Sequence, residues 1–461
     1  MSFLSVQFMI LITVLIILLK FIHDKYAERI LLLAASYLFY ACFDLRMLAV
    51  LIGLSVFTWF GGKMMILSKT AGNVKASKAI CLACIAIQTA VLLFFKFSGL
   101  LPMPVGLSFY MLQAISFLAD NYSEKLQKYP SFIDSLIYIG FFPQIVSGPI
   151  VKAKDFIPQL DNRKELTKER LSYGVQLFAL GAFMKLVMAD RLAVSVDSVY
   201  SAPCAYSGLS LFITSVGYSL QLLFDFAGYS NMAISAAWLL GYDLGKNFNL
   251  PYLASDPSDF WKRWHISLSS WLRDYVYIPL GGSRKGKFRT YLNIFLTMLI
   301  SGLWHGSTIN FIIWGSLHGL WQVIHRAVRD IGMSSASNKK AEGHNTLPLR
   351  FRHFASIIVN FIIVDFLWIP FRTETLSDTW MIVSRIIMLK PGISYYYVYT
   401  FIFAAILIIV QLFAVYRNNG DNPLKPLPLN TLHGKVIFCC FIISIAMFAY
   451  FGNGAFIYAQ F

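Results

Sequence analysis

Charged side chains are scarce in this sequence of 461 residues. Only 13% of the residues are charged, whereas 57% are hydrophobic, and the mean hydropathy is +0.62. A soluble core of this size cannot hide so much apolar surface, which excludes a water-soluble enzyme. At about 20 apolar residues per bilayer crossing, the composition predicts an all-α, polytopic membrane protein with about ten to twelve transmembrane helices.

Acidic residues are fewer than basic ones. The 23 Asp and Glu residues stand against 39 Lys and Arg residues, which gives a formal net charge of +16. In a membrane protein this excess is typical of basic cytosolic loops, so no nucleic-acid partner is expected. Residues 1–19 are apolar, and the first basic residues, Lys20 and Lys25, follow them. This order is opposite to that of a cleaved signal peptide, and it predicts a retained first helix with an extracytoplasmic N-terminus.

Cysteine is also rare, with six residues, and the one CxxC pair is Cys81 and Cys84 inside an apolar run. We interpret this pair as buried small residues rather than as a redox or zinc site. The sequence contains neither an HExxH nor a GxSxG motif. No metal is therefore expected.

A glycine-bearing basic loop at 281–287 fits the first positions of a P-loop. Phe288, however, replaces the Ser or Thr that would bind magnesium, so nucleoside triphosphate binding is not expected. The basic residues of this loop either hold the phosphates of a nucleotide thioester or anchor the loop on the cytosolic side. They are Arg284, Lys285, Lys287 and Arg289.

Polar segments interrupt the apolar runs at residues 152–170, 256–289 and 333–348. The last segment has the Ser, Asn and Lys content of a loop. The run 252–280, rich in Trp and Tyr, indicates a helix that lies at the membrane interface.

No internal repeat with solenoid spacing is present. We therefore expect a single membrane domain over residues 1–461, with a motif-bearing core at about 105–330. Further helices, outside that core, are expected at 355–461.

Two histidines occur in unusual surroundings. His305 stands in an uncharged apolar run between Gly302 and Gly306, and His265 in an aromatic and basic segment. An imidazole at membrane depth is either hydrogen-bonded to a neighbouring helix or functional. The two glycines favour function, because they permit the close approach of a substrate or a backbone. A helix that starts at Arg289 places His305 about 24 Å away, so a base there can serve only a substrate that enters through a tunnel.

Two further patterns each have two interpretations. Asp225 is a carboxylate in an apolar run that either lines the same cavity or pairs with a basic residue such as Lys185. A row of aromatic residues and histidines three or four residues apart shares one helical face. We interpret this row as a packing seam rather than as a second catalytic row. Its members are Trp314, His318, Trp321 and His325.

Polar motifs recur between about residues 105 and 320. They occupy residues 142–149, 189–192, 224–230, 247–252, 260–269, 273–275, 277–282 and 304–306. Together they resemble the membrane-bound O-acyltransferase family, and more narrowly its bacterial branch that contains the alginate O-acetylation membrane subunit. The resemblance implies a ring of helices around a central tunnel, in which a cytosolic acyl thioester meets an acceptor from the other face of a bacterial cytoplasmic membrane.

The same resemblance implies roles for individual residues. His305 corresponds to the catalytic histidine of the family, and His265 to a second histidine in the preceding polar segment. As a general base, His305 would deprotonate an acceptor hydroxyl while His265 or backbone donors stabilise the oxyanion. Alternatively, His305 itself becomes acylated. The candidates for lining the tunnel or binding the donor are Asp225, Trp304, Arg273, Asp274, Arg284, Lys285 and Lys287.

The expected function is transfer of an acetyl group from cytosolic acetyl-CoA across the membrane, for O-acetylation of an extracytoplasmic polysaccharide. No permanently bound cofactor is expected. The expected partners are membrane lipid and an extracytoplasmic acetyltransferase or polysaccharide synthase. One alternative is D-alanyl transfer to teichoic acid from a carrier protein. An alternative of another class is a transporter or flippase without chemistry, which predicts paired half-helices in two related halves.

Overall fold

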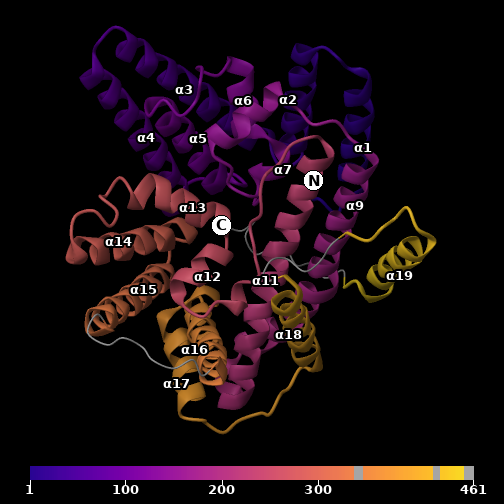
Figure 1. The fold of residues 1–461 in the computed structure, drawn as a ribbon, viewed down its shortest axis with the longest axis vertical. Helices are drawn as coiled ribbons and strands as arrows, with labels where there is room; N and C mark the ends of the chain where they lie inside the picture. The colour runs from indigo at the N-terminus through magenta and orange to yellow at the C-terminus, as the bar shows by residue number, and fades with distance from the viewer. Residues whose placement is uncertain (337–345, 419–425, 451–461) are drawn as a thin grey trace.

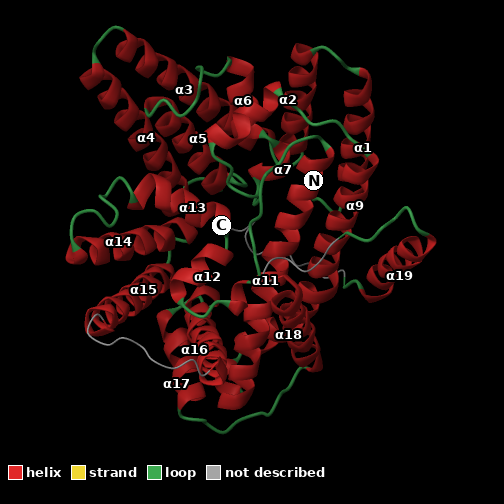
Figure 2. Cartoon of the chain, in the orientation of Figure 1, coloured by secondary structure: helices red, strands yellow, loops and turns green. Residues whose placement is uncertain are grey.

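The computed structural model describes residues 1–336, 346–418 and 426–450. Within these residues every regular element is helical, and the one β contact is an isolated bridge between Tyr206 and Ile393 (Figure 2). This confirms the all-α prediction. The first half of the chain forms α1 (Val6–Phe21), α2 (Lys25–Ala41), α3 (Leu45–Thr70), α4 (Val74–Phe97), α5 (Leu107–Tyr122), α6 (Phe132–Gly140), α7 (Phe142–Ile145), α8 (Ala153–Asp161), α9 (Lys168–Phe183), the π-helix η1 (Met184–Ala189) and α10 (Asp190–Tyr200).

The second half begins with the longest helix and continues through a run of short ones. Its elements are η2 (Pro203–Ala205), α11 (Gly208–Leu239), η3 (Pro251–Leu253), α12 (Pro257–Arg263), α13 (Ile266–Leu272), the π-helix η4 (Arg273–Tyr277), α14 (Lys287–His305), α15 (Ile309–Ala336), α16 (Thr346–Arg372), α17 (Leu376–Ile387), α18 (Val398–Asn418) and α19 (Leu432–Phe448). Figure 1 shows α3–α6 at one end of the molecule, α16–α18 at the other, and α12 and α13 between them.

Four helices among the described residues are long and apolar enough to cross a membrane. They are Leu45–Thr70, Val74–Phe97, Gly208–Leu239 and Arg352–Arg372. Three shorter apolar helices accompany them: Val6–Phe21, Val398–Val410 and Leu432–Phe448. These helices make the chain a multi-pass membrane protein, as the composition predicts. The expected number of ten to twelve crossings stays a prediction.

Glycines allow several close helix contacts in the fold. A Cβ atom at Gly181 of α9 would lie 2.6 Å from the Gly228 carbonyl oxygen of α11. A Cβ atom at Gly302 of α14 would lie 2.3 Å from the Phe311 carbonyl oxygen of α15, and one at Gly306 would meet the Phe311 ring at 2.0 Å. Both approaches leave no room for a larger residue. The glycines beside His305 are expected to admit either a substrate or a protein backbone. In the structure Gly302 and Gly306 admit Phe311 of α15, which supports the second explanation.

The run 252–280 is not the single interfacial helix that its composition indicates. It is divided into η3, α12, α13 and η4, and the division between α12 and α13 falls at His265, whose φ of +43° is left-handed. The prediction fails because the backbone of Asn247 accepts a hydrogen bond from Ile266 N, at 2.8 Å, and pulls the chain out of its helical path.

The structure also tests the predicted loop, the cysteine pair and the C-terminal helices. The predicted loop at 333–348 overlaps two helices at its ends, because α15 continues to Ala336 and α16 starts at Thr346. The remaining residues of that prediction, 337–345, lie outside the described residues. Cys81 and Cys84 are buried in α4, where Cys84 packs against Gly61 of α3. Their prediction as buried small residues is confirmed. The expected C-terminal helices are present as far as α19, and residues 451–461 of that region lie outside the described part.

Candidate active site

His305 is the last residue of α14 and has only 1% of its surface exposed. The helix ends there because Gly306 takes an extended conformation, with φ −164° and ψ 169°. Three aromatic rings surround the imidazole: Trp304 at 4.8 Å, Trp314 of α15 at 4.9 Å and Phe371 of α16 at 5.3 Å between ring centroids. The end of one helix and the sides of two others therefore hold the ring in a fixed, dry position.

His265 is held by a polar cluster at the break between α12 and α13. Its Nδ1 atom lies 3.2 Å from Oδ1 of Asn247, and the same Oδ1 accepts a hydrogen bond of 2.8 Å from the Ser267 hydroxyl. The amide of Asn247 in turn donates to Ser230 of α11 at 2.9 Å. Because Oδ1 is an acceptor, Nδ1 of His265 carries the proton and Nε2 is the basic nitrogen. The buried ring is thus fixed in orientation and in tautomer.

Trp304 joins the two histidines into one cluster. Its ring centroid lies 6.2 Å from that of His265 and 4.8 Å from that of His305. The indole nitrogen donates to the Ser108 carbonyl of α5 at 3.1 Å, and Phe109 packs against the ring at 5.3 Å. The structure therefore brings together the three residues that the sequence motifs single out, and the N-terminal turn of α5 supports them.

Asp225 has a basic partner, one of its two predicted interpretations. Its Oδ1 lies 2.6 Å from Nζ of Lys185, which also contacts Asp190 at 2.8 Å. The side chains of Lys185 and Asp225 are almost fully buried. The cation joins η1 to α10 and α11, and loss of either carboxylate would leave a buried charge that is only partly compensated. The next residue, Phe226, packs on His265 at 4.6 Å, so α11 carries both the ion pair and one wall of the site.

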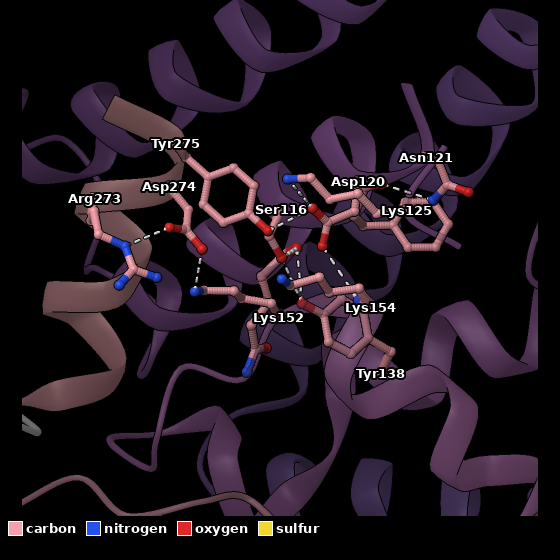
Figure 3. A network of polar contacts seen from close by, with 12 residues as sticks. Ser116, Asp120, Asn121, Lys125, Tyr138, Lys152, Lys154, Arg273, Asp274 and Tyr275 are labelled. Carbon is pink, nitrogen blue, oxygen red and sulfur yellow. Dashed lines mark hydrogen bonds and ion pairs between the residues drawn. The ribbon is translucent and has the colours of Figure 1, made fainter. Parts of the chain in front are cut away.

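Asp274 orients two basic residues from opposite sides. Its two carboxylate oxygens contact Arg273 Nε at 2.8 Å and Lys152 Nζ at 2.6 Å (Figure 3). Burial raises the pKa of Asp274, but the hydrogen bonds from Arg273 and Lys152 outweigh burial and hold this pKa below its usual range. Arg273 and Asp274, both predicted to line the tunnel or bind the donor, therefore form an ion pair, and of the two only Arg273 lines a cavity described below.

A second carboxylate belongs to the same network. Figure 3 shows Asp120, at the end of α5, accepting a 2.8 Å hydrogen bond from the Tyr275 hydroxyl and contacting Lys125 at 3.2 Å. The backbone N–H of Lys154 donates to its other oxygen at 3.3 Å. These contacts fix η4 against α5. They stabilise the wall that carries Arg273.

Two cavities lie on either side of α13. The larger has a volume of about 460 Å³, and its basic lining residues are Lys262, Arg273 and Arg326. The smaller, of about 350 Å³, contains Lys152 and Lys246, and the two cavities share Ile266 and Ser270. Trp261 of the larger cavity lies 5.9 Å from Trp314 between ring centroids, and Trp314 packs on His305. His265, Trp304 and His305 themselves are in neither lining.

The predicted basic loop does not line either cavity. Arg284 and Lys285 are exposed between η4 and α14, Lys287 is exposed at the start of α14, and each is absent from both linings. Arg326, which the sequence did not single out, lines the larger cavity instead. Arg326 lies in α15, far along the chain from the other basic residues of the cavity, so no local sequence pattern connects it with them.

The row of residues along α15 forms a packing seam, as predicted. The His318 ring is buried between Trp314 at 4.9 Å, Trp261 at 5.1 Å and Trp368 of α16 at 5.9 Å. Trp314 of this seam also contacts His305. The expected motif core ends at about residue 330 and so omits Trp368 and Phe371, although both lie in the aromatic shell around the histidines.

The described residues contain no group of three or more His, Cys, Asp or Glu side chains that could hold a metal ion. What they do contain is an all-helical membrane domain that buries three histidines, of which His265 and His305 both pack on Trp304. Buried imidazoles of this kind can accept and return protons inside a membrane domain.

The sequence profile of MBOAT, the membrane-bound O-acyltransferase family, matches residues 4–368, and the chain belongs to this family. It is an acyltransferase, as its resemblance implied. The chain is 35% identical over 398 residues to the "probable alginate O-acetylase AlgI" of Pseudomonas putida, a match that covers 82% of this chain and 78% of that protein. It is 31% identical over 422 residues to the peptidoglycan O-acetyltransferase of Helicobacter pylori, which covers 81% and 77% of the two chains.

A teichoic acid D-alanyltransferase from Bacillus subtilis matches a smaller part of the sequence. The two are 29% identical over 229 residues, which is 47% of this chain and 57% of that protein. The similarity to O-acetyltransferases thus extends over much more of the molecule.

Proposed function

We propose that the protein transfers an acetyl group from cytosolic acetyl-CoA, across the membrane, for O-acetylation of an extracytoplasmic polysaccharide. The observation that carries the proposal is the burial of His265, Trp304 and His305 in one cluster next to a cavity lined with cations. The long similarity to relatives named as alginate and peptidoglycan O-acetylating enzymes supports acetyl as the group transferred.

The larger cavity is the proposed site for the phosphates of the donor. Lys262, Arg273 and Arg326 face it from three different elements, and guanidinium groups bind phosphate oxygens with two parallel hydrogen bonds. Trp261 and Tyr277 add flat apolar surface to the same lining. From there the acyl arm has to reach His305 past Trp261 and Trp314, which form the proposed tunnel wall.

His305 is the proposed general base. It takes the proton from the acceptor hydroxyl as the oxygen attacks the thioester carbonyl carbon, and the carbonyl electron pair moves onto oxygen as an oxyanion. Collapse of the oxyanion breaks the carbon–sulfur bond, and the thiolate leaves with the proton that His305 returns. Neutral imidazole is required for the first step, and the dry aromatic surroundings favour the neutral form. Asn247 fixes the tautomer of His265. We propose that His265 assists His305 by orienting the acceptor hydroxyl and the thioester.

The acceptor reaches His305 from the other face of a bacterial cytoplasmic membrane in this scheme, with the N-terminus extracytoplasmic. An extracytoplasmic acetyltransferase or a polysaccharide synthase is the proposed partner that receives or uses the acetyl group, and membrane lipid surrounds the helices. No permanently bound cofactor takes part.

The test uses purified protein in sealed vesicles of known orientation. We expect acetyl-CoA labelled in its acetyl group to be consumed when the cavity faces the added donor, and not when it faces the lumen. The variant His305→Ala serves as the inactive control. Equal consumption in both orientations would contradict transfer across the membrane. Consumption of a D-alanyl carrier protein instead of acetyl-CoA would assign the chain to D-alanyl transfer, and consumption of neither donor would contradict both proposed donors.

A further inference from the structure

Lys96 is a cation at the catalytic end of α14 that the sequence motifs do not include. It lies in the last turn of α4, one of the four candidate membrane spans, and is partly buried. Its ammonium group donates a hydrogen bond to the carbonyl oxygen of Trp304. Trp304 directly precedes His305, so this contact places a positive charge one residue from the proposed base.

The contact between Lys96 and Trp304 caps the C-terminal end of α14. The last four carbonyl groups of an α-helix have no partner inside the helix, and the negative end of the helix dipole attracts a cation. At the end of α14, the Gly302 carbonyl accepts from Gly306 N at 3.3 Å, and Lys96 serves the carbonyl of Trp304. The indole of the same Trp304 is held by Ser108. Lys96 therefore fixes the backbone of Trp304, the residue directly before His305 in α14.

The charge of Lys96 is not neutralised by a carboxylate. Among the residues that the structure describes, none of the acidic side chains forms an ion pair with it, in contrast to Lys185 with its two carboxylates. His265 and His318 lie in the same aromatic cluster as His305, His265 through Trp304 and His318 through Trp314. Lys96 is therefore the cation that the structure places at the end of α14, beside His305.

We propose that Lys96 is a positioning residue of the active centre, which holds the end of α14 and favours the negative charge that forms on the acyl carbonyl oxygen. The inference rests on the proposed acyl transfer at His305. In that reaction the acceptor proton moves to His305 and the oxyanion develops in the same step. A preorganised positive charge in a water-excluded site stabilises such an oxyanion more than it stabilises the neutral thioester, and this difference raises kcat.

Three substitutions separate the charge from the hydrogen bond. Lys96→Gln keeps an N–H donor but removes the charge, Lys96→Met removes both, and Lys96→Arg keeps both. We expect Lys96→Gln and Lys96→Met to lower kcat by about 10- to 100-fold with little change of KM, because one electrostatic contribution to the transition state is lost. Lys96→Arg should recover most of the activity.

Lys69 is a matched control. It lies in the last turn of α3 and donates to the carbonyl oxygen of Tyr122, the last residue of α5, at 2.9 Å. Unlike Lys96, it forms an ion pair, with Glu124 at 2.7 Å. The end of α5 that it serves is about 20 Å from Ser108 and the active centre, at 1.5 Å per residue. Lys69→Gln should therefore change kcat by less than about twofold.

The experiment measures two quantities for each variant. One is the kcat and KM of the purified protein with acetyl-CoA, and the other is the ester content of cell-surface polysaccharide per amount of folded protein in the membrane. Loss of kcat in Lys96→Gln, with rescue by Lys96→Arg, supports the proposal. Wild-type activity in Lys96→Gln, equal losses in Lys96→Gln and Lys69→Gln, or failure of Lys96→Arg to rescue would overturn it. If acetyl-CoA is not the donor, the ester content still ranks the variants, so the two proposals fail separately.

Discussion

Arg273 and Arg284 provide a direct comparison between the cavity and the exposed loop. Both arginines follow the break at His265, yet only Arg273 lines the larger cavity. The prediction is that Arg273→Gln raises the KM for acetyl-CoA, whereas Arg284→Gln leaves it unchanged.

The magnitude follows from the contact that is lost. A hydrogen bond between charged groups contributes about 1.5 to 3 kcal/mol, and about 1.4 kcal/mol corresponds to a tenfold change in affinity. The side chain of Arg273 is 62% exposed and shares its charge with Asp274, so solvent screening reduces the effect to the lower end of the range. We therefore expect a rise in KM of about tenfold with kcat little changed, because binding of the phosphates is uniform in the ground and transition states.

The assay is the initial rate of acetyl-CoA consumption at two salt concentrations. Phosphate binding by exposed cations weakens with salt, so the wild-type KM should rise with salt more steeply than that of Arg273→Gln. Arg284→Gln, which removes the same charge a short distance away, controls for the overall field of the protein. An equal rise of KM in both variants, or a larger rise in Arg284→Gln, would show that the donor is bound by the loop or by long-range potential and not in the cavity.

The remaining predictions concern the catalytic base and the packing around it. His305→Ala should lower kcat by at least about 10²-fold, the contribution of a positioned general base, and retained activity in the purified variant would remove His305 from the mechanism. Asp225→Asn should lower the unfolding temperature in detergent, because the buried Lys185 loses one of two carboxylates and such a loss costs about 1 to 3 kcal/mol; an unchanged temperature would mean that the ion pair contributes no stability. Gly302→Ala should destabilise the protein by about 1 to 3 kcal/mol through its clash with α15, whereas Gly53→Ala, with no atom within 4 Å of the new Cβ, should be neutral or stabilising, and equal unfolding temperatures for the two would contradict the packing argument.

The sequence predicts the chemical residues of the site better than their surroundings. His305 and His265 could be found because an ionisable ring in an apolar run is costly and therefore informative. Trp304 was identified with them because it belongs to the same short motif. Asp225 could be recognised as a buried carboxylate with Lys185 as a candidate partner, but only the structure decides between this pairing and a place in the cavity wall.

The parts that could not be predicted come from contacts between distant segments. Lys96 and Phe371 lie about 209 and 66 residues from His305 in the chain, and neither carries a local pattern that relates it to a histidine. The division of the run 252–280 depends on Asn247, which binds the backbone of Ile266 and overrides local helix propensity. Likewise, whether a glycine admits a substrate or a neighbouring helix is decided by the packing around it and not by its own sequence context.

Chemistry and foldability make opposite demands on position 265. A histidine in the left-handed conformation costs about 1 to 2 kcal/mol relative to glycine, and asparagine tolerates this region better than most residues. The break that carries the φ of +43° would therefore form more easily without the imidazole. Glycine or asparagine would relax this backbone, but either would leave space where the buried ring packs on Phe226. The strained backbone is therefore retained together with the ring that fills the site.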